Sequence, residues 1–146
     1  MPTTTNKGYE VPTTGSEVNT WGALINTGSF GVIDLNLGGV TTKTLASSNV
    51  ALSASESQTL VCRLIGTLGA NVLVTTLAKG MTIVENLTSG AFAVTFGNGV
   101  GTPVTIPQGT RALVITDATN GARVAADNQT EFASGDVVLL DRGVPV

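Results

Sequence analysis

The residues able to do chemistry are few in this chain and stand far apart. The sequence contains no histidine and one cysteine, Cys62. A Ser-His-Asp triad, a Cys-His pair and an ordinary zinc site are therefore excluded or unsupported. The ten acidic residues are well separated and fall mostly at turns or at the ends of predicted elements. Carboxylate chemistry of the glycosidase type is the remaining catalytic alternative, and we expect the chain not to be an enzyme.

Two stretches resemble ligand-binding loops in composition only. Asp127, Glu131 and Asp136 fall in "ADNQTEFASGD", which could loop around Ca²⁺ but lacks the alternating oxygen ligands and the terminal acid of an EF-hand. "GNGVG" at 97–101 is glycine-rich, but Thr102 and Pro103 follow where a phosphate-binding loop needs a helix. We predict no metal and no cofactor.

Cys62 lies in "QTLVCRLIG", where Leu60, Cys62 and Leu64 share one face of a predicted strand. This alternation predicts a buried side chain that behaves as a small hydrophobe. An intersubunit disulfide or a redox role is the alternative.

Composition limits the classes of partner. Apolar residues make up 42% of the chain and charged residues only 12%, against a usual charged fraction of about 25%. We therefore expect a partner subunit to cover part of the surface. The seven basic residues are scattered, with no two adjacent, so we predict no nucleic-acid binding. No apolar run is long enough for a membrane span, and the first 20 residues lack a signal-like apolar segment; we expect synthesis in the cytoplasm.

The N-terminal part divides into an arm and a helix. Residues 1–14 are rich in threonine and contain two prolines, which predicts an extended arm. Residues 15–39 predict one helix over 17–37, with Ser16 or Asn19 as its N-cap. The pair Gly38 and Gly39 is expected to end it, with a glycine in the left-handed conformation.

The apolar positions of this helix follow a heptad spacing, with a glycine in one slot. They are Val18, Trp21, Ile25, Gly28, Val32 and Leu35. The helix either lies across the sheet of its own subunit or meets two other copies around an axis, and periodicity alone favours neither. In both cases a glycine that faces the covering surface permits close approach.

From residue 50 the sequence alternates apolar and polar residues, with turn residues every 8 to 12 positions. This pattern predicts a mainly β domain over 40–130, an antiparallel β-sandwich or jelly-roll-like fold. "NLTSGAF" and "DATNGAR" predict two hairpins, the second through Asn120-Gly121. A C-terminal extension, 131–146, carries the apolar run 137–140. The predicted strands are 50–54, 58–66, 70–77, 80–87, 91–97, 104–107, 111–117 and 122–127.

Two longer stretches resemble a known family. "GYEVPTTGSEVNTWGALINTGSFGVIDLNLGG" resembles the N-terminal module of tailed-bacteriophage fibre and other virion structural proteins, through its Gly-Tyr…Pro lead, Asn-Thr-Trp-Gly and Leu-Gly-Gly. "TIVENLTSGAFAVTFGNGVGTPVTIPQGTRALVITDATNGARVA" is similar to a β-module that often follows it. Together they cover most of the chain. The matching residues of the first stretch are Gly8, Tyr9, Pro12, Asn19, Thr20, Trp21, Gly22, Ile25, Asn26, Ile33, Asp34, Leu37, Gly38 and Gly39.

The resemblance implies a non-enzymatic virion protein, commonly trimeric, that attaches or associates through its N-terminal region. The length of 146 residues fits a short fibre, a fibre-attachment protein or a capsid decoration protein, with capsid, collar or tail proteins as partners. The competing hypothesis is a receptor- or glycan-binding module that uses two loops of the β-domain. The residues of these loops are Asn98, Thr102, Thr119 and Asn120.

Overall fold

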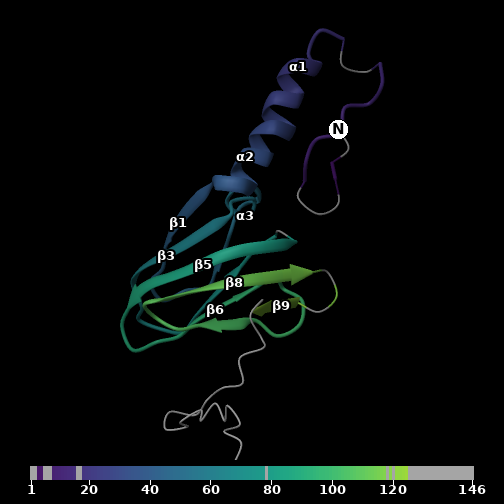
Figure 1. Cartoon of the computed structure of the whole chain (residues 1–146). Helices are drawn as coiled ribbons and strands as arrows, with labels where there is room; N and C mark the ends of the chain where they lie inside the picture. The colour runs from purple at the N-terminus through teal and green to yellow at the C-terminus, as the bar shows by residue number, and fades with distance from the viewer. Residues whose placement is uncertain are drawn as a thin grey trace, which may run out of the picture.

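A computed structural model describes residues 3–4, 8–15, 18–77, 79–117, 119 and 121–124. It contains two mixed β-sheets and one long N-terminal helix, so the predicted mainly β class with a helix in front of it is confirmed (Figure 1). The C-terminal extension, the acidic segment with Asp127, Glu131 and Asp136, and the side chain of Asn120 lie outside the described residues.

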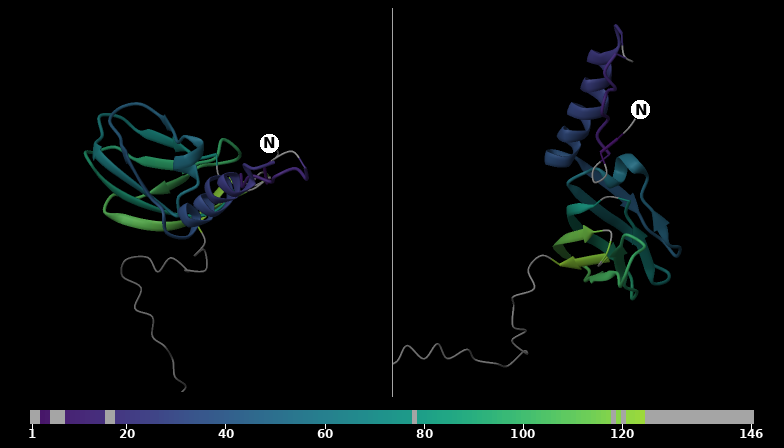
Figure 2. Two further views of the ribbon diagram at one scale, coloured as in Figure 1. Left: turned by 90° about the horizontal axis from the view of Figure 1, so that it is seen from above. Right: turned by 90° about the vertical axis from the view of Figure 1, so that its right-hand side faces the viewer.

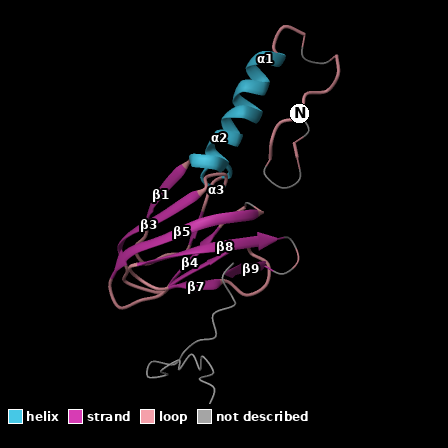
Figure 3. Ribbon diagram, in the orientation of Figure 1, coloured by secondary structure: helices cyan, strands magenta, loops and turns pink. Residues whose placement is uncertain are grey.

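The long helix joins three segments end to end, and one short helix and nine strands follow (Figure 3). The long helix consists of α1 (Trp21–Leu24), the π-helical segment η1 (Ile25–Phe30) and α2 (Gly31–Gly38). The other elements are β1 (Val40–Thr44), β2 (Val50–Ala51), α3 (Ala54–Ser57), β3 (Val61–Thr67), β4 (Val72–Thr75), β5 (Gly80–Ser89), β6 (Val94–Gly97), β7 (Val104–Ile106), β8 (Thr110–Asp117) and β9 (Gly121–Val124).

The first six strands alternate between the two sheets. The five-stranded sheet has the order β1-β3-β5-β8-β9 and the four-stranded sheet the order β2-β4-β6-β7. Strands β1, β3 and β5 are parallel, and so are β2, β4 and β6. The chain thus makes three successive coils, each with one strand in either sheet, before β7, β8 and β9 add antiparallel pairs. The prediction of an antiparallel fold is wrong for these first six strands, and the described strands form no jelly-roll.

Successive coils are joined by the same contact at one corner. The amide of Leu45 donates to the carbonyl of Ile65, and the amide of Leu68 donates to the carbonyl of Ser89, at 2.8 Å each. The next residues are Gly66 and Gly90, both at positive φ. A Cβ on Gly90 would lie 2.6 Å from the carbonyl oxygen of Leu68, and one on Gly66 would overlap that of Leu45. Only glycine fits where one backbone lies directly on the next.

Two asparagine side chains also join successive coils, at the point where each coil enters the four-stranded sheet. The side-chain oxygen of Asn49 accepts from the amide of Leu73, and that of Asn71 accepts from the amide of Ala93, at 2.9 Å each. Each asparagine satisfies a backbone amide that the parallel ladder does not reach. The coils are therefore fixed in register at this edge by side chains.

Both sheets contribute to one hydrophobic core. Alternate residues of the strands point inward, as the period of two predicts. Cys62 is fully buried among them, which confirms the prediction of a buried small hydrophobe. The large buried side chains include Leu45, Leu64, Val72, Val74, Val84, Val94, Phe96, Ile106 and Val114.

Asn86 is a fully buried polar residue in this core. Its amide nitrogen donates to the carbonyl of Ile106 at 2.6 Å, and its amide oxygen accepts from the backbone and the hydroxyl of Thr88. These bonds connect β5 of one sheet to β7 of the other. Because a buried amide without partners is costly, the network favours this one arrangement of the two sheets.

The local turn predictions had mixed outcomes. Strands β8 and β9 form the hairpin predicted from Asn120-Gly121. The hairpin predicted from "NLTSGAF" is wrong, because Gly90 turns the chain from β5 into the other sheet instead. Strand β1 and helix α3 were not predicted. The helix α3 has a capping box in which Ser53 and Glu56 satisfy each other's backbone amides.

The long helix rises from the edge of the body at β1 and extends beyond it (Figure 2). Its last turn is bonded to the start of β3, since the carbonyl of Leu35 accepts from the amides of Leu60 and Gly39. Gly39 is extended, with φ −68°, so the predicted left-handed glycine at the helix end is wrong. A Cβ on Gly39 would lie 2.6 Å from the carbonyl oxygen of Leu35, so this junction also requires glycine.

Because of the backbone contact at this corner, we expect two glycine substitutions to lower the free energy of unfolding by very different amounts. We expect Gly66→Ala to lower the free energy of unfolding by about 3 kcal/mol or more, because the new Cβ meets backbone that cannot move cheaply. The matched control is Gly99→Ala, which has φ +79° but nothing within 4 Å of its Cβ, and should cost only about 1–2 kcal/mol. Urea denaturation followed by far-UV circular dichroism measures both; equal losses would contradict the stacking argument.

The bonds of the Glu56 carboxylate lead us to expect that the folded protein loses stability in acid. The hydrogen bond from Lys43, at 2.8 Å, and the amide of Ser53 lower the pKa of Glu56 from 4.5 to about 2. A carboxylate with a lowered folded-state pKa stabilises the fold above its unfolded pKa, and this contribution is lost as the pH falls from about 4.5 to about 2. Glu56→Gln should flatten the unfolding free energy over that range, as measured by urea titrations at several pH values. An unchanged pH profile in the variant would refute the assignment.

Candidate functional site

The N-terminal arm folds against the long helix and is fixed there by backbone bonds. The amide of Glu10 donates to the carbonyl of Gly28 at 2.9 Å, and the hydroxyl of Ser29 donates to the carbonyl of Glu10 at 2.9 Å. The arm itself turns back at Gly8, where Thr4 bonds to Tyr9 through backbone and side chain. The described residues of the predicted extended arm, 3–4 and 8–14, therefore include a segment that is bonded to the chain's own helix.

Gly28 faces this arm. A Cβ on Gly28 would overlap the side chain of Glu10. The sequence led us to expect Gly28 to face either the sheet of its own subunit or another copy, and in the structure it faces the arm of the same chain. Gly28 lies within the π-helical segment η1, and its carbonyl accepts the amide of Glu10.

The π-helical segment changes which residues share a face of the helix. A π-helix has wider turns than the α-helix on which the heptad spacing depends. The six predicted positions from Val18 to Leu35 therefore do not form one straight stripe. The predicted helix start is also wrong, because the helix begins at Trp21, and Asn19 has φ +69° outside it. The other predicted N-cap, Ser16, is outside the described residues.

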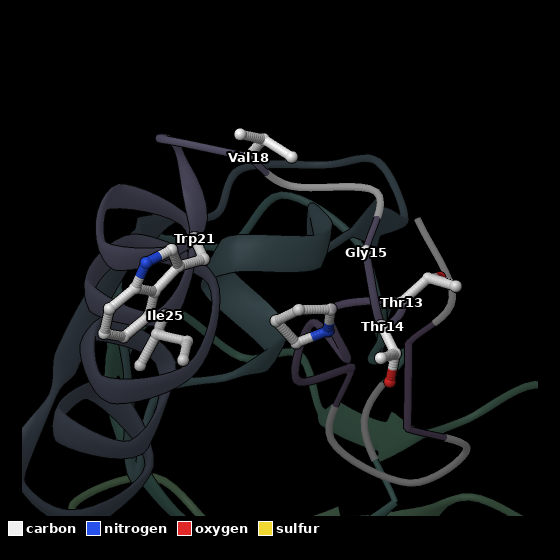
Figure 4. A pocket seen from close by; sticks show the side chains of 7 residues that line it. Thr13, Thr14, Gly15, Val18, Trp21 and Ile25 are labelled. Atoms are coloured by element: carbon white, nitrogen blue, oxygen red, sulfur yellow. The ribbon is translucent and has the colours of Figure 1, made fainter.

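Three of the six predicted residues meet at one hollow of about 370 Å³ between arm and helix. Figure 4 shows Trp21 and Ile25 on the helix, with Thr13 and Thr14 of the arm on the other side of the hollow and Val18 above. The hollow is lined by Pro12, Thr13, Thr14, Gly15, Val18, Trp21 and Ile25. The polar side-chain groups of this lining are the hydroxyls of Thr13 and Thr14 and the indole N–H of Trp21, and the lining carries no charge.

The apolar residues of the helix are covered only in part by their own subunit. No residue of α1, η1 or α2 is buried. Trp21 is 62% exposed, Phe30 62% and Leu37 74%, while Ile25, Val32 and Leu35 are half-buried. The interpretation that the helix lies across the sheet of its own subunit is therefore wrong. Phe30 was missed in the heptad pattern, although its spacing of seven from Leu37 was visible in the sequence.

The two predicted recognition loops lie side by side. The side-chain amide of Asn98 donates to the carbonyl of Asp117 at 2.6 Å, and Gly121 lies against the backbone of Val100 with no room for a Cβ. The amide of Thr119 donates to the side chain of Asp117. The side chain of Asn98 thus bonds the two loops to each other, while Thr102 and Thr119 are exposed.

The acidic side chains with described partners have structural roles. Glu85 bonds Arg63 at 2.9 Å and lies 3.6 Å from Arg111, and Glu56 bonds Lys43. The described residues contain no group of three or more histidine, cysteine or acidic side chains able to hold a metal ion. Nor does the described part of the chain contain a helix that is long and apolar enough to cross a membrane.

Comparison with protein-family models, with curated proteins and with solved structures gives no match for this chain.

Cys62 yields a simple test of the core. Burial raises the pKa of its thiol to about 12, and a thiol rather than a thiolate is a poor nucleophile. We expect Cys62 in the folded protein to react with a thiol reagent at least about 100-fold more slowly than in 6 M guanidinium chloride. Equal rates in the two states would show that this core opens freely.

Proposed function

We propose that this chain is a non-enzymatic structural protein of a tailed-phage virion, which associates as a homotrimer and with other virion proteins. A short fibre, a fibre-attachment protein or a capsid decoration protein fits this role. The two-sheet body would serve as a compact, sandwich-like platform and the helix as the associating element. The resemblance of the N-terminal stretch to virion modules supports the particle assignment.

The single observation that carries the proposal is the exposure of Trp21, Phe30 and Leu37 on a helix without buried residues. A helix rich in apolar residues gains most of its stability in water by covering those side chains. Here the body covers none of these three side chains. A helix that contains Gly22, Gly28 and Gly31, each costing about 1 kcal/mol relative to alanine, gains further from a partner surface.

Trp21 is the proposed anchor of this association, because tryptophan is enriched among the residues that dominate interface energies. It borders the hollow formed by the arm, so a partner side chain could insert beside it. We expect the protein to sediment as a trimer at micromolar concentration. We expect Trp21→Ala to weaken association by about 2 kcal/mol, roughly 30-fold in dissociation constant.

The matched control is Phe92→Ala, which removes another exposed aromatic ring from the body rather than the helix. Sedimentation equilibrium measures both variants, and far-UV circular dichroism establishes that they are folded. A strictly monomeric protein would contradict the homotrimer. A trimer unaffected by Trp21→Ala would reject only the anchor.

The second candidate is a receptor- or glycan-binding module, supported by the contact between the 97–103 loop and the turn after β8. The exposed residues there are small, with Thr102 and Thr119 as the hydroxyl donors. They offer no aromatic ring for a sugar face to stack on. A glycan array and a host-cell binding assay distinguish the candidates, since a purely structural protein binds particles and not cells.

A further inference from the structure

The outer faces of the two sheets differ in the apolar residues that they carry. On the four-stranded sheet the outward residues are mostly threonine, with Leu73 paired to Thr95 and Thr95 to Thr105. On the five-stranded sheet one row of outward residues crosses four strands and is entirely apolar. This row is Val40, Val61, Ile83 and Leu113, in direct register.

Further apolar pairs flank this row on the same face. Met81 pairs with Ile115 on one side, and Ile65 pairs with Leu87 on the other. Val40, Met81 and Leu87 are each more than half exposed. Exposed apolar side chains gathered on one face, rather than scattered singly, make this face a candidate interaction surface.

The row of charged side chains within this face forms ion pairs within the chain. Thr42, Arg63, Glu85 and Arg111 are in register between the apolar rows. Glu85 is largely buried, because its carboxylate lies between the two arginines. An apolar surface could therefore cover the face without leaving an unpaired carboxylate, and Arg111, the more exposed arginine, lies toward the rim.

The area of this face is smaller than the area that a stable interface buries. With strands about 4.8 Å apart and a rise of about 3.4 Å per residue, the patch measures about 400 Å². A stable interface buries about 800 Å² per partner. The helix adds a strip about 27 Å long and about 10 Å wide, and its exposed Leu37 is only three residues from the exposed Val40 of the sheet.

We infer that a second copy of this chain covers the outer face of the five-stranded sheet, in the same assembly that covers the helix. This inference rests on the proposed self-association and extends it from the helix to the body. Each copy presents the same two surfaces, joined at Gly39, so one neighbour can contact both and reach the area of an ordinary interface. The polar face of the other sheet then remains in water.

Single cysteines test which face is covered. Leu87→Cys places a thiol on the apolar face and Thr105→Cys places one on the polar face, while buried Cys62 serves as a slow background. We expect alkylation of Leu87→Cys to slow at least tenfold as the concentration rises through the range in which sedimentation detects association. Alkylation of Thr105→Cys should not change.

Charge substitutions give an independent measurement. Leu113→Glu should lower the sedimenting mass, whereas the matched control Leu73→Glu, on the outer face of the other sheet, should not. A Leu87→Cys rate that stays fast in the assembled protein would overturn the inference and leave helix-based association intact. A rate already slow in the monomer would also overturn it, since the chain's own residues would then cover the face. A wild-type protein that is monomeric at every concentration would remove the proposed homotrimer and this inference together.

Discussion

The direct stacking of one backbone on the backbone of the previous coil is the contact on which the rest of the fold depends. Gly66 lies over Leu45, and Gly90 lies over Leu68, each with no room for a Cβ. Because the coils stack, β1, β3 and β5 become parallel neighbours, and so do β2, β4 and β6. The buried leucines at these corners then fill the space between the sheets. The same restriction recurs at Gly39, where the last turn of the helix lies on the start of the body.

Features that depend on a few neighbouring residues could be predicted from the sequence, whereas strand pairing could not. The burial of Cys62 and the β8–β9 hairpin follow from alternation and from Asn120-Gly121, which are local signals. Whether Gly90 closes a hairpin or crosses to the other sheet depends on Leu68, 22 residues away. One signal was available and not used: Leu45 with Asn49-Val50 and Leu68 with Asn71-Val72 repeat one pattern. A repeat of 22 to 23 residues indicates stacked coils.

The helix site could be predicted only in part, because some of its features also depend on residues far away in the sequence. The exposure of Trp21 removes one of the two alternatives that the sequence left open, a helix that lies across the sheet of its own subunit. The straight heptad seam failed because it assumes a uniform helix, and η1 interrupts it beside Gly28. The arm explains this segment physically: the carbonyl of Gly28 bonds the amide of Glu10, and Gly28 leaves space for that side chain. No local signal in residues 25–30 reveals a partner that lies near residue 10.

The low charge of the chain has a structural explanation. A core only two sheets thick, built from strands of 2 to 10 residues, buries few side chains, yet 42% of the residues are apolar. The remainder is not scattered evenly, because the outer face of the four-stranded sheet is mostly threonine while the other outer face and the helix carry valine, isoleucine, leucine and tryptophan. Solubility alone would favour polar residues on both faces. The asymmetry therefore requires a second cause, and the self-association proposed above would supply one, since covering apolar side chains removes the cost of leaving them in water.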